Sequence, residues 1–87
     1  MLDEMIGQSV VVDLSSQFVC LGRLTRVDDL HLELHDADLH DLRDTRTTRE
    51  NYVAAALATG VKRNRKRVLL VRAEVVAIAC VKEVVEE

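Results

Sequence analysis

Gly22 interrupts a long run of strand-forming residues, and this interruption most constrains what the chain can fold into. Residues Phe18 to Val27 are mainly aliphatic or β-branched, a composition typical of a β-strand. Glycine adds no side-chain packing, so a glycine in the middle of a strand marks a bend, a bulge or a close backbone approach. The sequence therefore predicts a long strand that bends sharply at Gly22, so that a small sheet curls on itself.

Further strands are predicted on both sides of this run. Apolar side chains alternate at Val10, Val12 and Leu14, and again over His31 to Leu39. Residues 68–85 indicate two more strands, which makes five. The 87 residues contain no proline, and neither an internal repeat nor a low-complexity linker interrupts them, so residues 1–87 are expected to form one domain. A chain of this length buries only about 60% of its unfolded surface and is marginally stable as a monomer.

Two helices are expected beside the strands. Residues 2–6 can form a short N-terminal helix, with acidic residues in its first turn and a glycine after its end. Thr47 followed by Glu50 has the spacing of a capping box, and Gly60 stands where a C-terminal glycine cap belongs. The pattern predicts a second helix over about residues 48–59, inserted between the third and fourth strands.

Two segments, Gly22 to Ala37 and Val68 to Ile78, together resemble the two signature motifs of the Sm/LSm (Hfq-related) family of RNA-binding ring proteins. Residues 2–14 also resemble the opening helix, turn and first strand of that family, and the resemblance leaves out roughly residues 39–66. It implies a mainly β fold, a small and strongly bent five-stranded antiparallel Sm-like (SH3-like) barrel. The residues that match the first motif are Gly22, Leu24, Asp28, Leu30, Leu32, Leu34, Asp36 and Ala37.

Residues Val75 to Val81 leave neither face of the last strand polar. A small antiparallel sheet with one wet face should alternate instead. An apolar, unpaired strand edge is an association site, and in Sm rings the fourth strand of one subunit pairs with the fifth strand of the next. We therefore expect a ring-shaped homo-oligomer whose contacts include residues 68–81.

The resemblance also implies a base-binding pocket made by Asp28, His31 and Arg72. An arginine can stack on the face of a base while a polar side chain reads its edge and a carboxylate orients the donors. The chain departs from the family pattern here: His31 replaces an asparagine, Ala73 replaces a glycine, Glu74 follows, and one residue is missing after Asp28. Histidine can still stack and hydrogen-bond. The alternative is that these residues brace the loops or a subunit interface.

Charge is strongly segregated along a chain whose net charge is −3. Residues 1–44 carry ten acidic and three basic residues, whereas residues 45–72 carry one acidic and eight basic residues. A basic run can neutralise RNA phosphates and release counterions; as alternatives it forms a solvated loop or pairs with acids of a neighbouring subunit. The basic residues of this run are Lys62, Arg63, Arg65, Lys66 and Arg67, and the candidate acids are Asp36, Asp38, Asp41 and Asp44.

Several other functions are disfavoured. Phe18 and Tyr52 are the only aromatic residues, too few for the stacking platforms of RRM or cold-shock domains. His31, Glu33 and His35 could suggest a metal site, but on a strand they spread over roughly 13 Å, too far for one ion. No nucleophile elbow, phosphate-cradling glycine loop or paired nucleophile and base is present. We expect no enzyme activity, no cofactor and no metal.

The cysteines and the lack of recognisable targeting segments indicate the cellular compartment. Cys20 and Cys80 lie within apolar strands and are expected to be reduced core thiols rather than a disulfide. No signal peptide or membrane span is recognisable, so a cytoplasmic protein is expected.

The preferred function is an Sm-like ring that binds short single-stranded RNA, rich in uridine or adenine, as a chaperone or scaffold. The alternative is a structural or protein-binding ring that has lost the RNA pocket.

Overall fold

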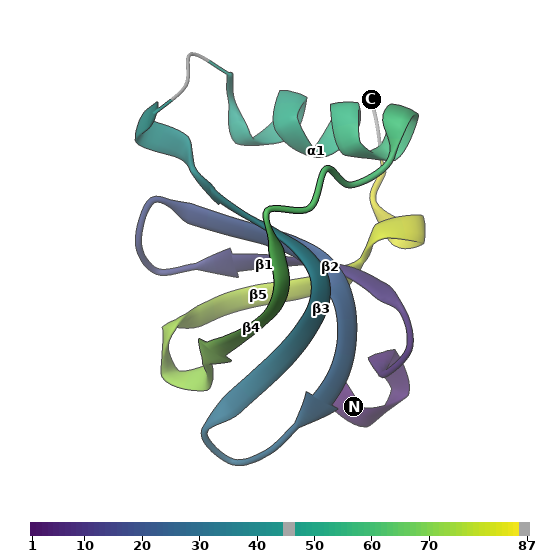
Figure 1. Ribbon diagram of the computed structural model, residues 1–87, viewed down its shortest axis with the longest axis vertical. Helices are drawn as coiled ribbons and strands as arrows, with labels where there is room; N and C mark the ends of the chain where they lie inside the picture. The colour runs from purple at the N-terminus through teal and green to yellow at the C-terminus, as the bar shows by residue number, and fades with distance from the viewer. Residues whose placement is uncertain (45–46, 86–87) are drawn as a thin grey trace.

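The computed structural model describes residues 1–44 and 47–85, which form one bent sheet with a helix packed against it (Figure 1). Helical elements occupy both ends of the chain and the connection between the third and fourth strands. In chain order the elements are a 3₁₀ helix Leu2–Met5, β1 Ser9–Leu14, β2 Phe18–Val27, β3 His31–Asp41, a 3₁₀ turn Leu42–Asp44, α1 Arg49–Thr59, β4 Arg65–Val71, a 3₁₀ turn Arg72–Glu74, β5 Val75–Cys80 and a 3₁₀ turn Val81–Glu83.

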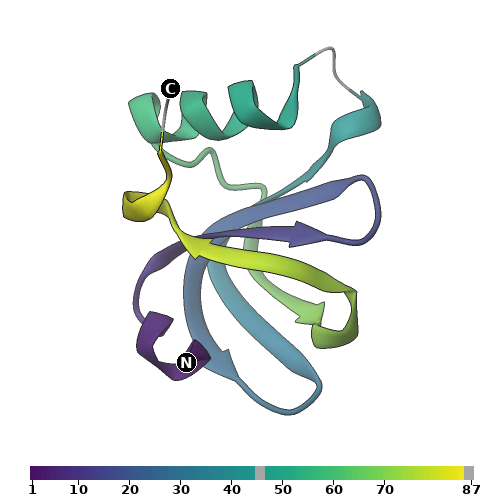
Figure 2. The same ribbon diagram turned by 180° about the vertical axis from the view of Figure 1, so that it is seen from behind.

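The five strands form one antiparallel sheet in the order β4-β3-β2-β1-β5. This confirms the predicted five-stranded antiparallel fold with a short N-terminal helix and a helix inserted between the third and fourth strands. β2 and β3 are the most curved strands, and β5 crosses behind them (Figures 1 and 2). In the described part of the chain, β4 and β5 each pair with a single strand and form the two edges of the sheet.

The predicted irregularity at Gly22 is confirmed as a bulge between β2 and β3. Leu21 pairs with Asp38 and Arg23 pairs with His35, so Gly22 faces two residues of β3, Asp36 and Ala37. A Cβ atom at Gly22 would lie 3.0 Å from the Cβ of Ala37 and 3.2 Å from the carbonyl oxygen of His35. Glycine is needed here because the two backbones approach too closely for a side chain.

Two apolar clusters lie on opposite faces of the bent sheet. The inner cluster is enclosed by the curled strands, and the second lies between the outer face of β1 and β2 and the helix α1. Three consecutive β1 residues, Val10, Val11 and Val12, are therefore all buried, because each face of β1 meets a different cluster. The inner cluster consists of Val10, Val12, Cys20, Leu24, Leu32, Leu34, Ala37 and Leu70, and the outer one of Val11, Val19, Leu21 and Val53.

The two cysteines are free and buried, as expected for reduced core thiols. Cys20 lies on β2 opposite Val12, whereas Cys80 lies at the end of β5 opposite Val10. Burial, reinforced by the nearby Asp38 carboxylate, raises the pKa of the Cys20 thiol to about 12. A thiol held protonated in this way is a poor nucleophile.

The inserted helix α1 is fastened to the sheet by polar contacts as well as by Val53. Arg49 forms an ion pair with Asp13 of β1, and the Tyr52 hydroxyl donates a hydrogen bond to Asp38 of β3. The Tyr52 ring also stacks on His40 with ring centroids 4.2 Å apart. Burial, followed by the bond to Asp38, raises the pKa of Tyr52. These contacts hold α1 over the sheet on the side opposite the β2–β3 loop (Figure 1).

The predicted cap of this helix was wrong by one residue. Thr48, not Thr47, is the N-cap, and its hydroxyl accepts a hydrogen bond from the backbone N–H of Asn51 at 3.2 Å. An N-cap hydroxyl reaches the N–H three residues on, so Asn51 rather than Glu50 occupies that position. The C-terminal prediction is confirmed, since Gly60 has a φ of 88° and its N–H donates to the Ala56 carbonyl oxygen.

Strand boundaries also differ from the predicted ones. β3 extends two residues beyond Leu39 to Asp41, and β5 ends at Cys80, with a 3₁₀ turn after it. β4 begins at Arg65 rather than Val68, so half of the basic run expected on a loop belongs to a strand. Backbone pairing of Arg65 and Arg67 with Ala37 and His35 outweighs the low strand preference of charged residues. Within the described residues, none of the helices is long and apolar enough to span a membrane.

Replacing Gly22 with valine should destabilise the fold by about 1–3 kcal/mol, because the new side chain overpacks against β3. Valine has the better strand propensity, so the opposite result would follow if propensity dominated. Urea unfolding of the two chains measures the difference. The milder Gly22→Ala variant should recover part of its loss when Ala37→Gly removes the facing methyl group. Equal stability of Gly22→Val and the parent would show that the close approach does not matter.

Candidate nucleic-acid interface

The loop between β2 and β3 and the turn between β4 and β5 lie against each other at one rim of the sheet. The backbone N–H of Arg72 donates to the Leu30 carbonyl oxygen at 2.8 Å. The guanidinium Nη1 of Arg72 donates to the Asp28 carbonyl oxygen, also at 2.8 Å. Two segments more than 40 residues apart in the sequence are thus joined by both the backbone and the side chain of one arginine.

Asp28 organises the β2–β3 loop through its carboxylate. One oxygen, Oδ1, accepts the backbone N–H groups of Leu30 at 2.8 Å and of His31 at 2.6 Å. The same oxygen lies 3.7 Å from Nδ1 of His31. The bond from Leu30, followed by that from His31, holds the pKa of Asp28 below its usual value, because both favour the ionised form. The loop-bracing alternative for Asp28 therefore has direct geometric support.

Between the loop and the turn lies an open hollow of about 450 Å³. His31 and Arg72 line it, as the resemblance implied, together with Ala73, which stands where the family pattern has glycine. Leu30 and Val71 also line it, with exposures of 68% and 53%. Exposed aliphatic side chains beside a guanidinium offer both an apolar support and a stacking cation for a flat ring. Leu30 and Val71 were not predicted to belong to the site, although each adjoins one of its residues, His31 or Arg72, in the sequence.

Two further residues refine this picture. Glu74, the last residue of the turn, does not line the hollow. Its carboxylate accepts a hydrogen bond from the Ser15 hydroxyl, and its carbonyl oxygen accepts one from the Ser15 N–H at 2.8 Å. Asp28 lies on the other side of His31, in a smaller polar hollow of about 100 Å³. The acid at position 74 is therefore engaged by the β1–β2 turn, and the acid that lines the hollow beside Arg72 is Asp29.

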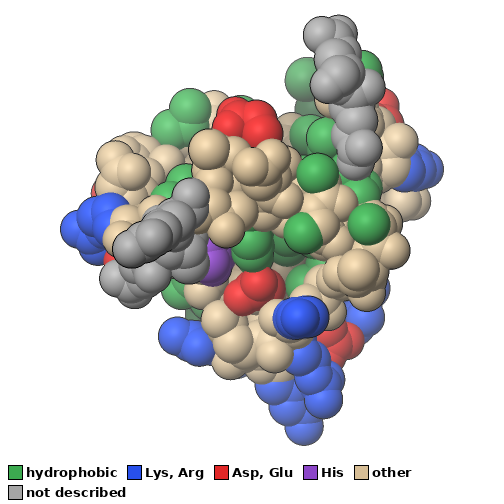
Figure 3. All heavy atoms as spheres, turned by 90° about the horizontal axis from the view of Figure 1, so that it is seen from above, with side chains coloured by type: hydrophobic (Ala, Val, Ile, Leu, Met, Phe, Trp, Pro, Cys, Tyr) green, Lys and Arg blue, Asp and Glu red, His purple; other side chains and the backbone are tan. Residues whose placement is uncertain are grey.

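The basic run does not belong to this hollow. Arg65 begins β4 and Arg72 follows its end, so the two are roughly 23 Å apart at the rise of a strand. The structure thus brings together Asp28, His31 and Arg72 and places Lys62 to Lys66 toward the opposite end of β4, whereas Arg67 lines the small hollow beside Asp28 and His31. Seen from above, Lys and Arg side chains gather toward one side of the molecule, the lower part of Figure 3.

Two members of the basic run are engaged within the chain. Nη1 of Arg63 lies 2.5 Å from Oδ1 of Asp36, and Nη2 of Arg67 lies 3.1 Å from Oε1 of Glu33. The hydrogen bond from Arg63 is the main cause that holds the pKa of Asp36 below its usual range, and the hydrogen bond from Arg67 does the same for Glu33. Lys62, Arg65 and Lys66 have no carboxylate partner in the part of the chain that the structure describes.

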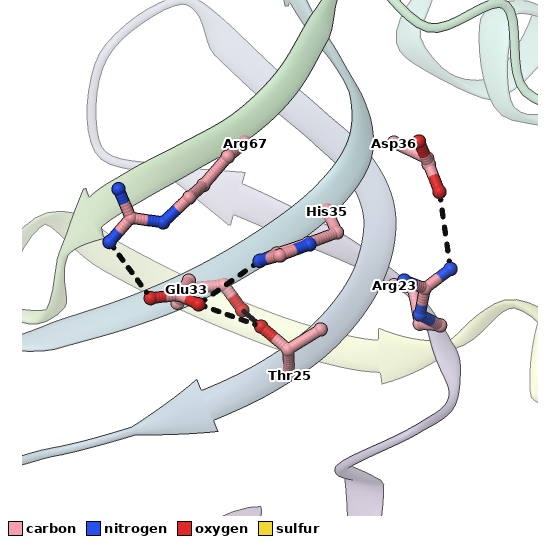
Figure 4. Close-up of polar contacts among 6 residues, drawn as sticks. All are labelled: Arg23, Thr25, Glu33, His35, Asp36 and Arg67. Atoms are coloured by element: carbon pink, nitrogen blue, oxygen red, sulfur yellow. Dashed lines mark hydrogen bonds and ion pairs between the residues drawn. The ribbon is translucent and has the colours of Figure 1, made fainter.

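Most of the acidic residues near the basic run also have partners within the chain. Figure 4 shows the Glu33 carboxylate bound to Arg67, Thr25 and His35, and the Asp36 carboxylate bound to Arg23. The Arg23–Asp36 ion pair measures 3.2 Å. Asp38 accepts from Tyr52, and Asp41 pairs with Arg43 at 2.9 Å, while the side chain of Asp44 lies outside the described residues. The proposed pairing of these acids with a neighbouring subunit would have to compete with the internal contacts.

Metal-ligating groups do not gather in the described residues. Glu33 and His35 are 3.1 Å apart, but they contact each other and Arg67, while His31 contacts Asp28. Across residues 1–44 and 47–85, no group of three His, Cys, Asp or Glu side chains is arranged to hold an ion. The cluster that attracted attention in the sequence is thus a network of ion pairs and hydrogen bonds.

Comparisons with known proteins identify the fold. No known protein-family profile and no curated protein matches the chain. Among solved structures it is similar to the Sm protein of Pyrococcus abyssii in complex with a uridine heptamer. The TM-score is 0.62, the identity 21%, and the match covers 91% of this chain and 90% of the other. The chain therefore has an Sm-like fold, as the sequence motifs predicted.

Removing the carboxylate of Asp28 should loosen the β2–β3 loop, because the Leu30 and His31 N–H groups lose their shared acceptor. Hydrogen exchange measured residue by residue should show both amides exchanging faster in Asp28→Ala. Asp28→Asn retains an acceptor oxygen and should remain close to the parent. Asp29→Ala, at the neighbouring acid, is the matched control. Unchanged exchange in Asp28→Ala would remove the loop-organising role.

Proposed function

We propose that this chain is the subunit of an Sm-like ring that binds short single-stranded RNA as a scaffold or chaperone, without chemistry of its own. The observation that carries the proposal is the meeting of Asp28, His31 and Arg72, from two distant segments, where His31 and Arg72 line an open hollow and Asp28 contacts both residues. The fold-level similarity to an Sm protein solved with a uridine heptamer supports the same reading. Uridine-rich and adenine-rich strands are the ligands to test.

Arg72 is the central residue of the proposed pocket. Its Nη1 is engaged with the Asp28 carbonyl oxygen, which fixes the guanidinium plane while leaving further N–H donors and both faces of the group. A base stacked on that plane would rest against Leu30 and Val71, and the His31 ring could stack or hydrogen-bond at its edge. Pre-positioned side chains reduce the entropy lost on binding.

The ring is proposed from the two sheet edges. β4 and β5 each leave one edge unpaired among the described residues, and Val76 on β5 is 69% exposed. Pairing β4 of one copy with β5 of the next would satisfy both edges and cover this apolar strand. Because the hollow lies at the turn between these two strands, such pairing would bring neighbouring pockets close together, and several weak sites on one strand of RNA would act multivalently.

The rival function is a structural or protein-binding ring whose pocket no longer binds RNA. Specific features favour it: Ala73 adds a methyl group to the hollow, His31 replaces an amide side chain, and Asp28 and Arg72 already bond within the chain. The same ring edges would serve either function. RNA binding by the assembled protein separates the two.

For the pocket, Arg72→Ala and His31→Ala should each weaken RNA binding by about 1–3 kcal/mol through lost stacking. Fluorescence anisotropy with labelled oligo-uridine and oligo-adenine measures this. Arg72→Lys keeps the charge but not the planar group and should fall between parent and alanine variant. Arg43→Ala, an exposed arginine beyond the far end of β3, is the control. If the parent ring binds neither oligonucleotide even at about 50 mM salt, the structural ring becomes the favoured function.

For the basic run, replacing its five bases with glutamine should reduce the salt dependence of binding. Each phosphate contact contributes about −0.7 to the slope of log K against log salt for single strands. Arg72→Ala should instead lower affinity with nearly the same slope, since it contacts a base. Titrations between about 50 and 200 mM salt, with light scattering to verify the assembly, separate these effects. An unchanged slope in the Lys62, Arg63, Arg65, Lys66 and Arg67 variant would exclude phosphate contacts by the run.

A further inference from the structure

We infer that Arg65 and Lys66 of one subunit bind Glu4 and Glu83 of the next copy, so that ring assembly in this protein is directed by charge. The inference rests on the ring proposed above and identifies which side chains would meet in it. Arg65 and Lys66 would then take part in assembly, whereas the RNA hypothesis assigned them to phosphate contacts. Of the other three bases, Lys62 has no carboxylate partner among the described residues, and Arg63 and Arg67 are paired with Asp36 and Glu33.

The alignment follows from the two free edges. Every neighbouring pair of strands in the sheet is antiparallel, so we align β4 of one copy antiparallel to β5 of the next. β4 spans seven residues and β5 six, which allows nearly end-to-end pairing. In that alignment Val71 lies beside Val75 of the next copy, Lys66 lies beside Cys80, and Arg65 lies beside Val81. The basic beginning of β4 therefore reaches the end of β5.

The end of β5 adjoins a groove that suits such side chains. The groove has a volume of about 410 Å³ and runs between the N-terminal 3₁₀ helix and β5. Met5, Ile78 and Cys80 line its apolar part, and Glu4, Lys82 and Glu83 line its polar part. An apolar groove bordered by carboxylates can hold the aliphatic stem of a lysine or arginine while its charged end meets an acid.

The charges on both sides are unpaired within the subunit. Over the described residues, Glu4 and Glu83 have no basic partner within ion-pair distance, and Arg65 and Lys66 have no acidic one. All four residues are exposed. Lys82 and Met1, which carries the α-amino group, line the same groove, so Glu4 and Glu83 would act as individual partners and not through a net charge of the groove. The other acids near the basic run, Asp36 and Glu33, already bind Arg63 and Arg67.

Charge would act on register and partner choice more than on strength. The apolar side chains of β5 would bury at the contact whichever register formed, and a slip of one residue would reverse the faces of all of them. An exposed ion pair contributes little by itself. Repeated at every contact of a closed ring, however, oppositely charged ends select one register and one direction of pairing, and they make assembly sensitive to salt.

Charge reversal with rescue tests the inference. The base variant carries Arg65→Glu and Lys66→Glu, the acid variant carries Glu4→Lys and Glu83→Lys, and a third chain carries all four changes. At about 50 mM salt, each two-site variant should require about tenfold more protein to assemble than the parent, and the four-site variant should return toward the parent. Sedimentation velocity measures assembly, and circular dichroism verifies the fold. Arg43→Glu with Glu50→Lys is the control, placed away from both edges.

The outcomes separate the inference from the proposed function. A parent chain that stays monomeric at micromolar concentration overturns the ring itself. A parent ring that neither two-site variant weakens overturns the ion pairs and leaves the ring standing. Weakening by both variants without rescue, or by the base variant alone, overturns the assignment of Glu4 and Glu83 as partners. Loss in both, recovery in the four-site chain and weaker assembly of the parent at about 500 mM salt support it.

Discussion

The close approach of Gly22 to Ala37 is the contact on which the rest of this structure depends. A Cβ atom at residue 22 would lie 3.0 Å from the Cβ of Ala37, so any residue other than glycine would force β2 or β3 to shift where the two strands bend together. The bend curls the sheet around the inner cluster. It also leaves β4 and β5 as the two edges and carries the β2–β3 loop to the turn between them. Core, edges and candidate pocket thus share one geometric cause.

The inserted helix changes the sheet from a one-faced to a two-faced structure. α1 covers the outer side of β1 and β2 through Val53 and is held by Arg49 and Tyr52. A sheet of this size would otherwise leave Val11, Val19 and Leu21 in water. The additional cluster offsets the small core that a chain of 87 residues can build, and it occupies a face that lies away from the β2–β3 loop.

The polar residues fall into two groups with different physical roles. The hydrogen bonds of Asp28 and Arg72 order the β2–β3 loop and join it to the turn after β4, and this shapes the hollow beside them. Glu33 and Asp36 bind arginines from β4 and the segment before it, which neutralises part of the basic run. Among the described charges without an ion pair are Arg65 and Lys66 at the start of β4, and Glu4 and Glu83 in the groove beside β5. Local pairing therefore decides which charges are left to meet a partner.

The sequence alone determined the strand order in the chain, the irregularity at Gly22 and the C-terminal cap at Gly60, because each depends on local periodicity or on one residue type. Its resemblance to the Sm motifs predicted the Sm-like fold and proposed Asp28, His31 and Arg72 as a site. Tertiary structure decided that Thr48 caps α1, that β4 begins at Arg65 and that Glu74 faces Ser15. It alone placed most of the basic run away from the pocket, because pairings such as Arg63 with Asp36 join residues 27 positions apart and no local pattern encodes them.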